Sequence, residues 1–175
     1  PDRVFVFHGS RDATVGAAVS DSLVRFYRAF LPPERIRYET QVPAAHGMPT
    51  LDAGGDCATA EAPWILACRY DAAGEMLQYL YDGLIAPAGT VAGELREFDQ
   101  STYVTRGALA SMADTGFLFV PRDCAAGRPC RIHVAFHGCR QGVGFIGRRF
   151  ASASGYNRWA DANRIVVLYP QVDRS

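Results

Sequence analysis

The residues of this sequence best placed for chemistry are an acid and a histidine, each expected just beyond a β-strand. Asp12 follows the apolar run 4–7 and the dipeptide His8-Gly9, and His46 follows the alternating run 36–42. A carboxylate that orients a histidine has to be held rigidly, and a turn beyond a buried strand gives that support. Asp12 and His46 are therefore candidates for a pair in which the carboxylate fixes the imidazole and the imidazole acts as a general base.

Each of these residues also has a simpler interpretation. Asp12 is a suitable N-cap for a helix beginning near Val15, and a lone loop histidine such as His46 is commonly just exposed. Their order favours the catalytic interpretation, because an acid after one strand and a histidine after the next is the end of a Ser-Asp-His triad in α/β-hydrolases.

That triad requires a serine on a sharp turn of the form G-x-S-x-G, and the sequence contains none. The nearest match, residues 151–155, falls within an expected amphipathic helix. We therefore expect the nucleophilic serine to lie outside this chain.

Another histidine-glycine pair, His137-Gly138, follows the apolar run 131–136. Backbone N–H groups after such a strand turn are a known source of the oxyanion hole in acyl transfer, and here Cys139 would supply its N–H. The dipeptide alone is weak evidence, since a turn at a strand end needs glycine for steric reasons.

The periodicity predicts strands alternating with helices, which indicates an α/β fold around one sheet and a single domain over residues 1–175. The helix over 15–30 carries an apolar stripe that we expect to pack on the sheet, made of Val15, Val19, Leu23, Phe26, Tyr27 and Phe30. The pattern over 86–100 is weak. The expected strands are 4–7, 36–42, 116–121, 131–136 and 165–169, and the other expected helices are 71–84 and 150–162.

Composition excludes several classes of function. The 18 basic and 18 acidic residues cancel, so a polyanionic partner such as nucleic acid or an anionic membrane is not expected. No apolar run is long enough to span a bilayer, and nothing at Pro1 resembles a signal peptide.

The five cysteines favour an oxidising compartment. Cys57 with Cys68 and Cys124 with Cys130 lie close together in polar loops, and we predict two disulfides. The alternatives are five free thiols or a zinc site, but no C-x₂-C spacing occurs, so no metal is predicted. Cys139 is left over.

With these residues in view, the sequence resembles the poly(3-hydroxybutyrate) depolymerase family of α/β-hydrolases, in its secreted branch with circularly permuted chain order. The resemblance covers nearly the whole chain. It is carried by residues 8–15, 46–50, 57–74, 98–100, 133–141 and 155–163.

The resemblance implies an α/β-hydrolase-like sheet with flanking helices, apparently incomplete at both ends. It implies that Asp12 is the triad acid, His46 the base and Cys139 an oxyanion donor whose disulfide partner lies in an absent C-terminal segment. The expected activity is a secreted or periplasmic serine esterase that cleaves poly(3-hydroxybutyrate) or its oligomers without a cofactor. This chain alone is expected to be inactive.

Two alternatives stay open at this point. A carboxylesterase of the acetylxylan or feruloyl esterase type uses the same triad on another ester. A non-catalytic binding fragment would account for the missing nucleophile.

Overall fold

The computed structural model describes residues 2–103 and 111–173 and divides into two compact units, residues 1–84 and 85–175. The assignment of residues 1–175 to one domain stays a prediction.

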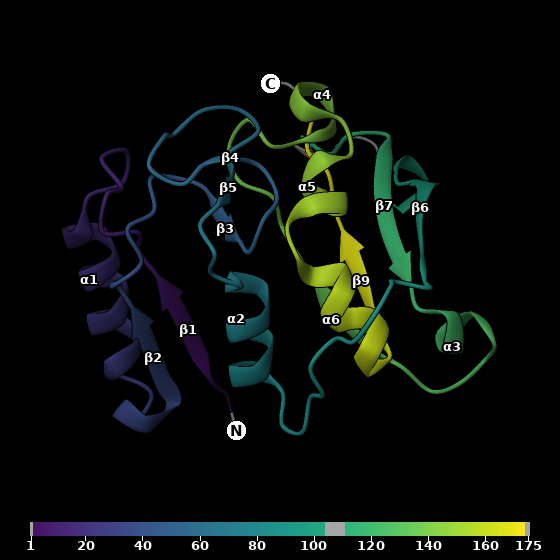
Figure 1. Ribbon diagram of the computed structural model, residues 1–175, viewed down its shortest axis with the longest axis horizontal. Coiled ribbons are helices and arrows are strands. Elements are labelled where there is room, and N and C mark those ends of the chain that lie inside the picture. The colour runs from purple at the N-terminus through teal and green to yellow at the C-terminus, as the bar shows by residue number, and fades with distance from the viewer. Residues whose placement is uncertain (1, 104–110, 174–175) are drawn as a thin grey trace. The chain divides into compact units, whose positions relative to one another are not determined.

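The first unit begins with a parallel pair of strands between two helices (Figure 1). Strand β1 (Val4–Phe7) pairs with β2 (Ile36–Glu39), with Val4 opposite Ile36. Helix α1 (Ala17–Arg28) joins these strands through a short 3₁₀ turn, η1 (Pro33–Arg35), and α2 (Ala72–Leu80) lies beside β1. Strand β2 ends before the expected residue 42 because the Glu39 carboxylate accepts a hydrogen bond from the Gln41 N–H at 2.8 Å.

The apolar face of α1 is less buried than its spacing predicts. Val24, which is not in the expected stripe, is 3% exposed, whereas Val19, Phe26 and Phe30 are more than half exposed. The expectation that this stripe packs on the sheet is therefore wrong. Two four-residue strands are too short to cover the whole apolar side of this helix.

A second, small sheet completes the first unit. Strands β3 (Met48–Thr50), β5 (Ile65–Ala67) and β4 (Gly55–Asp56) pair in that spatial order. Their core contains Leu66 and the turn residues Ala44 and Ala45, with the Cys57–Cys68 disulfide against it. The Asp71 carboxylate caps α2 by accepting from the Gly74 N–H, as the sequence predicts.

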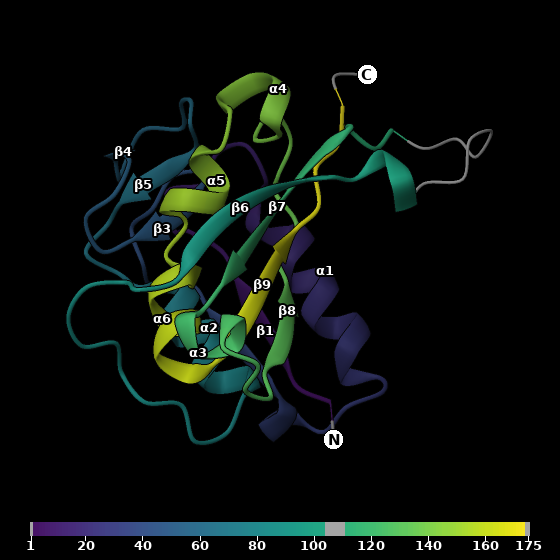
Figure 2. The same cartoon turned by 90° about the vertical axis from the view of Figure 1, so that its right-hand side faces the viewer.

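The second unit is a four-stranded mixed sheet with the order β6-β7-β9-β8 (Figure 2). Strands β7 (Thr115–Val120), β8 (Arg131–Val134) and β9 (Ile165–Tyr169) match the expected strands. Strand β6 (Glu94–Asp99) lies in the segment whose pattern is weak, because only Leu95 and Phe98 are partly buried and the other four residues are polar and exposed. The 3₁₀ turn η2 (Ser101–Tyr103) follows it.

Short helices accompany this sheet, in which Phe117, Val167 and Tyr169 are almost completely buried. The helix expected over 150–162 is divided at Gly155, which adopts a left-handed φ of 93° that a helix interior does not allow. The helices are α3 (Arg122–Ala125), α4 (Val143–Ile146), α5 (Arg149–Ala153) and α6 (Tyr156–Asn163).

The described strands thus pair in three groups, whereas the sequence predicts one sheet. Strands β3 to β5 follow a proline-containing turn and pair with one another instead of extending the β1–β2 pair. The class of fold, mixed sheets with flanking helices, is the α/β class predicted. None of the helices within residues 2–103 and 111–173 is long and apolar enough to cross a bilayer.

Candidate active site

Asp12 and His46 form a hydrogen-bonded pair in the first unit. His46 Nδ1 lies 2.9 Å from Asp12 Oδ2, within the range predicted for an acid and a base that act together. An ionised carboxylate only accepts hydrogen bonds, so Nδ1 carries the proton and donates it to Asp12. The second nitrogen, Nε2, then keeps a free lone pair, as a general base requires.

Two backbone hydrogen bonds between neighbouring loops bring this pair together. Beyond β1, the Ser10 N–H donates to the Val42 carbonyl at 2.8 Å and the Arg11 N–H donates to the Ala44 carbonyl at 3.1 Å. A Cβ on Gly9 would collide with the carbonyl of Ala44, so only glycine allows the two loops to run this close. The turn that carries Asp12 is thereby held against the loop that carries His46.

The other carboxylate oxygen of Asp12 is held by its own turn. Oδ1 accepts from the Thr14 N–H at 2.8 Å and from the Val15 N–H at 2.9 Å. Asp12 is not the N-cap of α1, because that helix begins at Ala17 with Gly16 at its N-cap. The backbone bonds instead fix the orientation of the carboxylate that faces His46.

Opposing effects act on the protonation of Asp12. Burial raises the pKa of Asp12, but the hydrogen bonds from Val15, His46 and Thr14 and the charge of His46 together hold this pKa below its ordinary value of 3.8. The carboxylate is therefore ionised throughout the neutral range. Its side chain is 11% exposed, whereas that of His46 is 39% exposed, so the imidazole is the group that solvent or a substrate reaches.

His8 has a structural role in this turn. It is 8% exposed, and its Nε2 lies 3.0 Å from the Val15 carbonyl, which can only accept. The ring therefore donates from Nε2 and closes the loop from residue 9 to residue 15 around Asp12. The sequence alone gives no signal that separates this role from catalysis.

The loop that carries His46 packs closely against Trp64 and Leu66. A Cβ on Gly47 would lie 2.8 Å from the Trp64 carbonyl oxygen and 2.9 Å from Leu66 Cγ, which are too close for any other residue. The Ala45 N–H donates to the Cys57 carbonyl at 2.8 Å, next to the Cys57–Cys68 disulfide. The sequence predicts only an irregular loop here, yet Ala44 and Ala45 are buried.

The disulfides match the predicted pairs. Cys57 is joined to Cys68 and Cys124 to Cys130, and Cys139 is an exposed free cysteine. Within the described residues, no group of three or more His, Cys, Asp or Glu side chains is arranged to hold a metal ion.

The described serines of the first unit do not complete a triad. Ser10, Ser20 and Ser22 make no hydrogen bond to the His46 ring, and the Ser22 hydroxyl donates to the Ala18 carbonyl within α1. In the second unit, Ser154 of the nearest G-x-S-x-G match is 1% exposed, so its hydroxyl is out of reach of a substrate.

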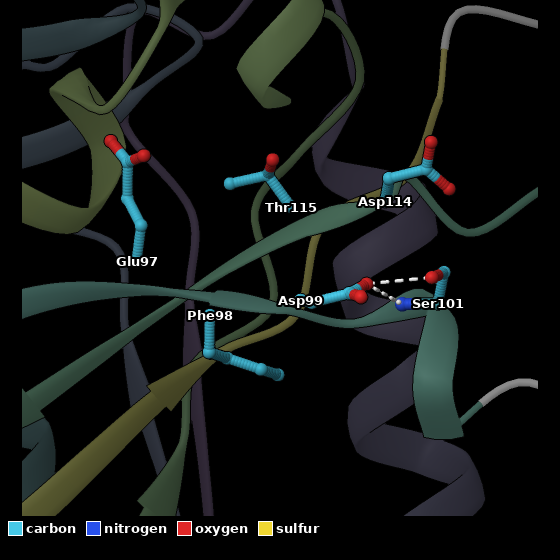
Figure 3. Close-up of a pocket in the computed structure, with 6 residues that line it drawn as sticks. All are labelled: Glu97, Phe98, Asp99, Ser101, Asp114 and Thr115. Carbon is cyan, nitrogen blue, oxygen red and sulfur yellow. Dashed lines mark hydrogen bonds between the residues drawn. The ribbon is translucent and has the colours of Figure 1, made fainter.

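Two hollows of about 440 Å³ each lie on the second unit. One is acidic: its carboxylates, on Glu97, Asp99 and Asp114, do not converge on one point, and Asp99 accepts from Ser101 Oγ at 2.6 Å (Figure 3). The other is apolar and is lined by Leu118, Leu168 and five further residues, Phe98, Gln100, Tyr103, Met112 and Pro170. Neither hollow is lined by a histidine.

Comparison with known proteins agrees with the sequence motifs. No family model matches the chain. It is 42% identical over 173 residues to a poly(3-hydroxybutyrate) depolymerase of Delftia acidovorans, covering 97% of this chain and 34% of that protein. It is 39% identical over 175 residues to a polyhydroxybutyrate depolymerase of Talaromyces funiculosus, covering 97% of this chain and 50% of that protein.

Solved structures give the same relationship. The crystal structure of PHB depolymerase from Penicillium funiculosum matches with a TM-score of 0.89 at 39% identity, covering 97% of this chain and 54% of that one. A PHB depolymerase with one serine replaced by alanine, complexed with an R3HB trimer, matches with a TM-score of 0.90 at 37% identity and the same coverage.

The chain thus spans between a third and about half of the length of the relatives that it matches. Over that span it is a homologue of the poly(3-hydroxybutyrate) depolymerases and has their fold.

Proposed function

We propose that this chain is part of the catalytic domain of a secreted or periplasmic serine esterase that hydrolyses ester bonds of poly(3-hydroxybutyrate) or its oligomers. Asp12 is the triad acid, His46 is the base, and Cys139 supplies a backbone N–H to the oxyanion hole. The nucleophilic serine lies outside residues 1–175, and the reaction needs no metal or organic cofactor.

The reaction proceeds through an acyl-enzyme. His46 Nε2 takes the hydroxyl proton of the serine as its oxygen bonds to the ester carbonyl carbon, and the Cys139 N–H stabilises the resulting oxyanion. When the intermediate collapses, the leaving 3-hydroxyl group takes the proton from Nε2. Water then attacks the acyl-enzyme with His46 again as base, which releases the acid and restores the serine.

The observation that carries this proposal is the 2.9 Å contact between His46 Nδ1 and Asp12 Oδ2. The pairing fixes the tautomer in which Nε2 is basic, on a ring that is partly exposed. The substrate class is supported by the relatives, one of which is complexed with an R3HB trimer. The two disulfides agree with an oxidising compartment.

The proposal is tested on the protein expressed from its complete coding sequence. Wild type, His46→Ala and Asp21→Asn are compared on 3-hydroxybutyrate trimer, p-nitrophenyl butyrate, acetylated xylan and a feruloyl ester. Asp21→Asn is a control because its carboxylate bonds to the exposed Tyr38 hydroxyl, away from the pair.

We expect the trimer to be the preferred substrate and its hydrolysis to require His46 but not Asp21. A fluorophosphonate probe should label a serine that lies outside residues 1–175. Preference for the xylan or feruloyl ester would show an esterase of the other type, and full activity of His46→Ala would refute the triad assignment.

A further inference from the structure

The turn that carries the proposed oxyanion donor is fixed by two side chains that no proposed catalytic step uses, His137 and Gln141. The Gly138 carbonyl accepts from the Gln141 N–H at 3.1 Å, which closes a β-turn over residues 138–141. Arg140, the third residue of this turn, has φ of 61°, as a type II turn requires. A left-handed conformation is unfavourable for a residue other than glycine, so the rest of the turn has to hold Arg140 there.

His137 donates the second hydrogen bond to the same carbonyl. Its Nδ1 lies 2.8 Å from the Gly138 oxygen, which can only accept, so Nδ1 carries the proton. Its Nε2 lies 3.2 Å from the Val172 N–H, which can only donate, so Nε2 is the acceptor. Both contacts select the same neutral tautomer and leave the ring one orientation.

Gln141 holds the other side of Gly138. Its side-chain oxygen accepts from the Gly138 N–H at 2.9 Å, and the residue is 6% exposed. Gly142 provides the room for this arrangement, because a Cβ there would lie 2.9 Å from the Val172 carbonyl oxygen and 3.0 Å from His137 Cε1.

These contacts determine the direction of the Cys139 N–H. The peptide bond from Gly138 to Cys139 is trans, so its C=O and N–H point in opposite directions. Since the Gly138 C=O points at His137 and the Gln141 N–H, the Cys139 N–H points away from them. Within residues 111–173, no hydrogen-bond acceptor is found for that N–H.

We infer that His137 and Gln141 are positioning residues, which hold the Gly138–Cys139 peptide plane so that the Cys139 N–H is aimed outward as an oxyanion donor before substrate binds. This inference rests on the proposed esterase function. An oxyanion donor stabilises charge that develops only in the transition state, so its misalignment lowers kcat and leaves KM unchanged.

The test uses five variants of the protein expressed from its complete coding sequence. Gln141→Met removes the acceptor and keeps the length of the side chain, whereas Gln141→Glu keeps an acceptor oxygen. His137→Phe removes both ring nitrogens and keeps the ring, whereas His137→Asn retains an N–H donor near the site of Nδ1. Ser152→Ala is the control, since its hydroxyl bonds to the Arg149 carbonyl within α5.

We expect Gln141→Met and His137→Phe to lose about 10- to 100-fold in kcat, less than the roughly 10²- to 10³-fold lost with a whole donor, at an unchanged KM. Gln141→Glu and His137→Asn should each recover at least part of the loss. Affinity for butylboronic acid, which forms a tetrahedral adduct on a serine, should fall in parallel with kcat. Ser152→Ala should behave as wild type.

The two proposals fail in different ways. Activity that survives His46→Ala refutes the proposed function. Activity that requires His46 but keeps wild-type kcat and boronate affinity in Gln141→Met and His137→Phe refutes the positioning role alone. If these variants do not fold, the NMR resonance of the Cys139 amide proton in the wild type tests the inference instead. A resonance that does not shift when butylboronic acid binds would overturn it.

Discussion

Replacing Asp12 by asparagine should reverse the tautomer of His46 while leaving the turn intact. The Thr14 and Val15 N–H groups both donate to Asp12 Oδ1, so in the variant they orient the introduced amide with its oxygen toward them. The NH₂ group of that amide then faces His46 Nδ1 and donates to it. Nδ1 becomes the acceptor, and the ring proton moves to Nε2, where it blocks the general base.

The expected loss of kcat follows from the move of the His46 ring proton from Nδ1 to Nε2. Loss of the correct tautomer lowers kcat by about 10⁴-fold in Ser-His-Asp enzymes, which corresponds to about 5 kcal/mol of activation free energy. The cost to folding should be only about 1–2 kcal/mol, because the two backbone bonds persist and lose only the assistance of the charge. Asp12→Asn should therefore lower kcat far more than it lowers the free energy of unfolding.

The pH dependence of stability offers a second measure of the same substitution. The pKa of Asp12 is lower in the folded protein than its ordinary value, so ionised Asp12 stabilises the fold above pH of about 4, and this contribution is lost as pH falls through the folded pKa. The difference in unfolding free energy between wild type and Asp12→Asn should be constant near neutral pH and shrink in acid.

The assays are turnover of the 3-hydroxybutyrate trimer and ¹⁵N NMR of the histidine rings, with Asp21→Asn as the matched control. In wild type the Nδ1 of His46 should be the protonated nitrogen, and in Asp12→Asn it should be Nε2. An unchanged tautomer, or a loss of activity below about tenfold, would refute the reasoning.

Three further sets of substitutions test other parts of the structure. Cys139→Pro removes one N–H at a turn position that proline favours, so its kcat should fall about 10²- to 10³-fold below that of Cys139→Ala, which keeps the N–H; equal rates would exclude the donor role. Arg164 ends α6 with φ of 52°, so Arg164→Gly should raise the unfolding free energy by about 1 kcal/mol and Arg164→Ala should not, as thermal unfolding measures. Replacing both Cys57 and Cys68 by serine opens the short loop that this disulfide closes, and it should lower the free energy of denaturant unfolding by about 3 kcal/mol. Under reducing conditions the wild type and this double variant should be equally stable. A loss below about 1 kcal/mol would show that the disulfide is dispensable.

Local patterns in the sequence predict most of the helices and strands. The misses come from tertiary structure, which a local pattern does not contain. The strand and helix spacings locate β1, β9 and α2 closely, because each has a clear apolar period. Strand β6 is missed because its edge position leaves it polar, and the burial of α1 is overestimated because helical spacing does not say how much sheet lies opposite.

The Asp12–His46 pair is predictable from the order of elements along the chain, but its support is not. Nothing in the sequence signals that Gly9 runs against the Ala44 carbonyl or that Gln141 reaches back to the Gly138 N–H. Each contact is made to a backbone group of another residue, and backbone groups carry no residue-specific pattern.

The three histidine-glycine pairs show that the same dipeptide can place a histidine in different roles. They share the same dipeptide, but among the three histidines only His46 bonds to a carboxylate. His8 and His137 each turn a ring nitrogen to a backbone carbonyl, of Val15 and Gly138, and so hold the loop on which the working group sits. A ring that donates to a carbonyl needs no carboxylate, because its task is to fix the backbone and not to become charged. The hydrogen-bond partner of the ring, and not the motif, therefore distinguishes the proposed base from the residues that position its surroundings.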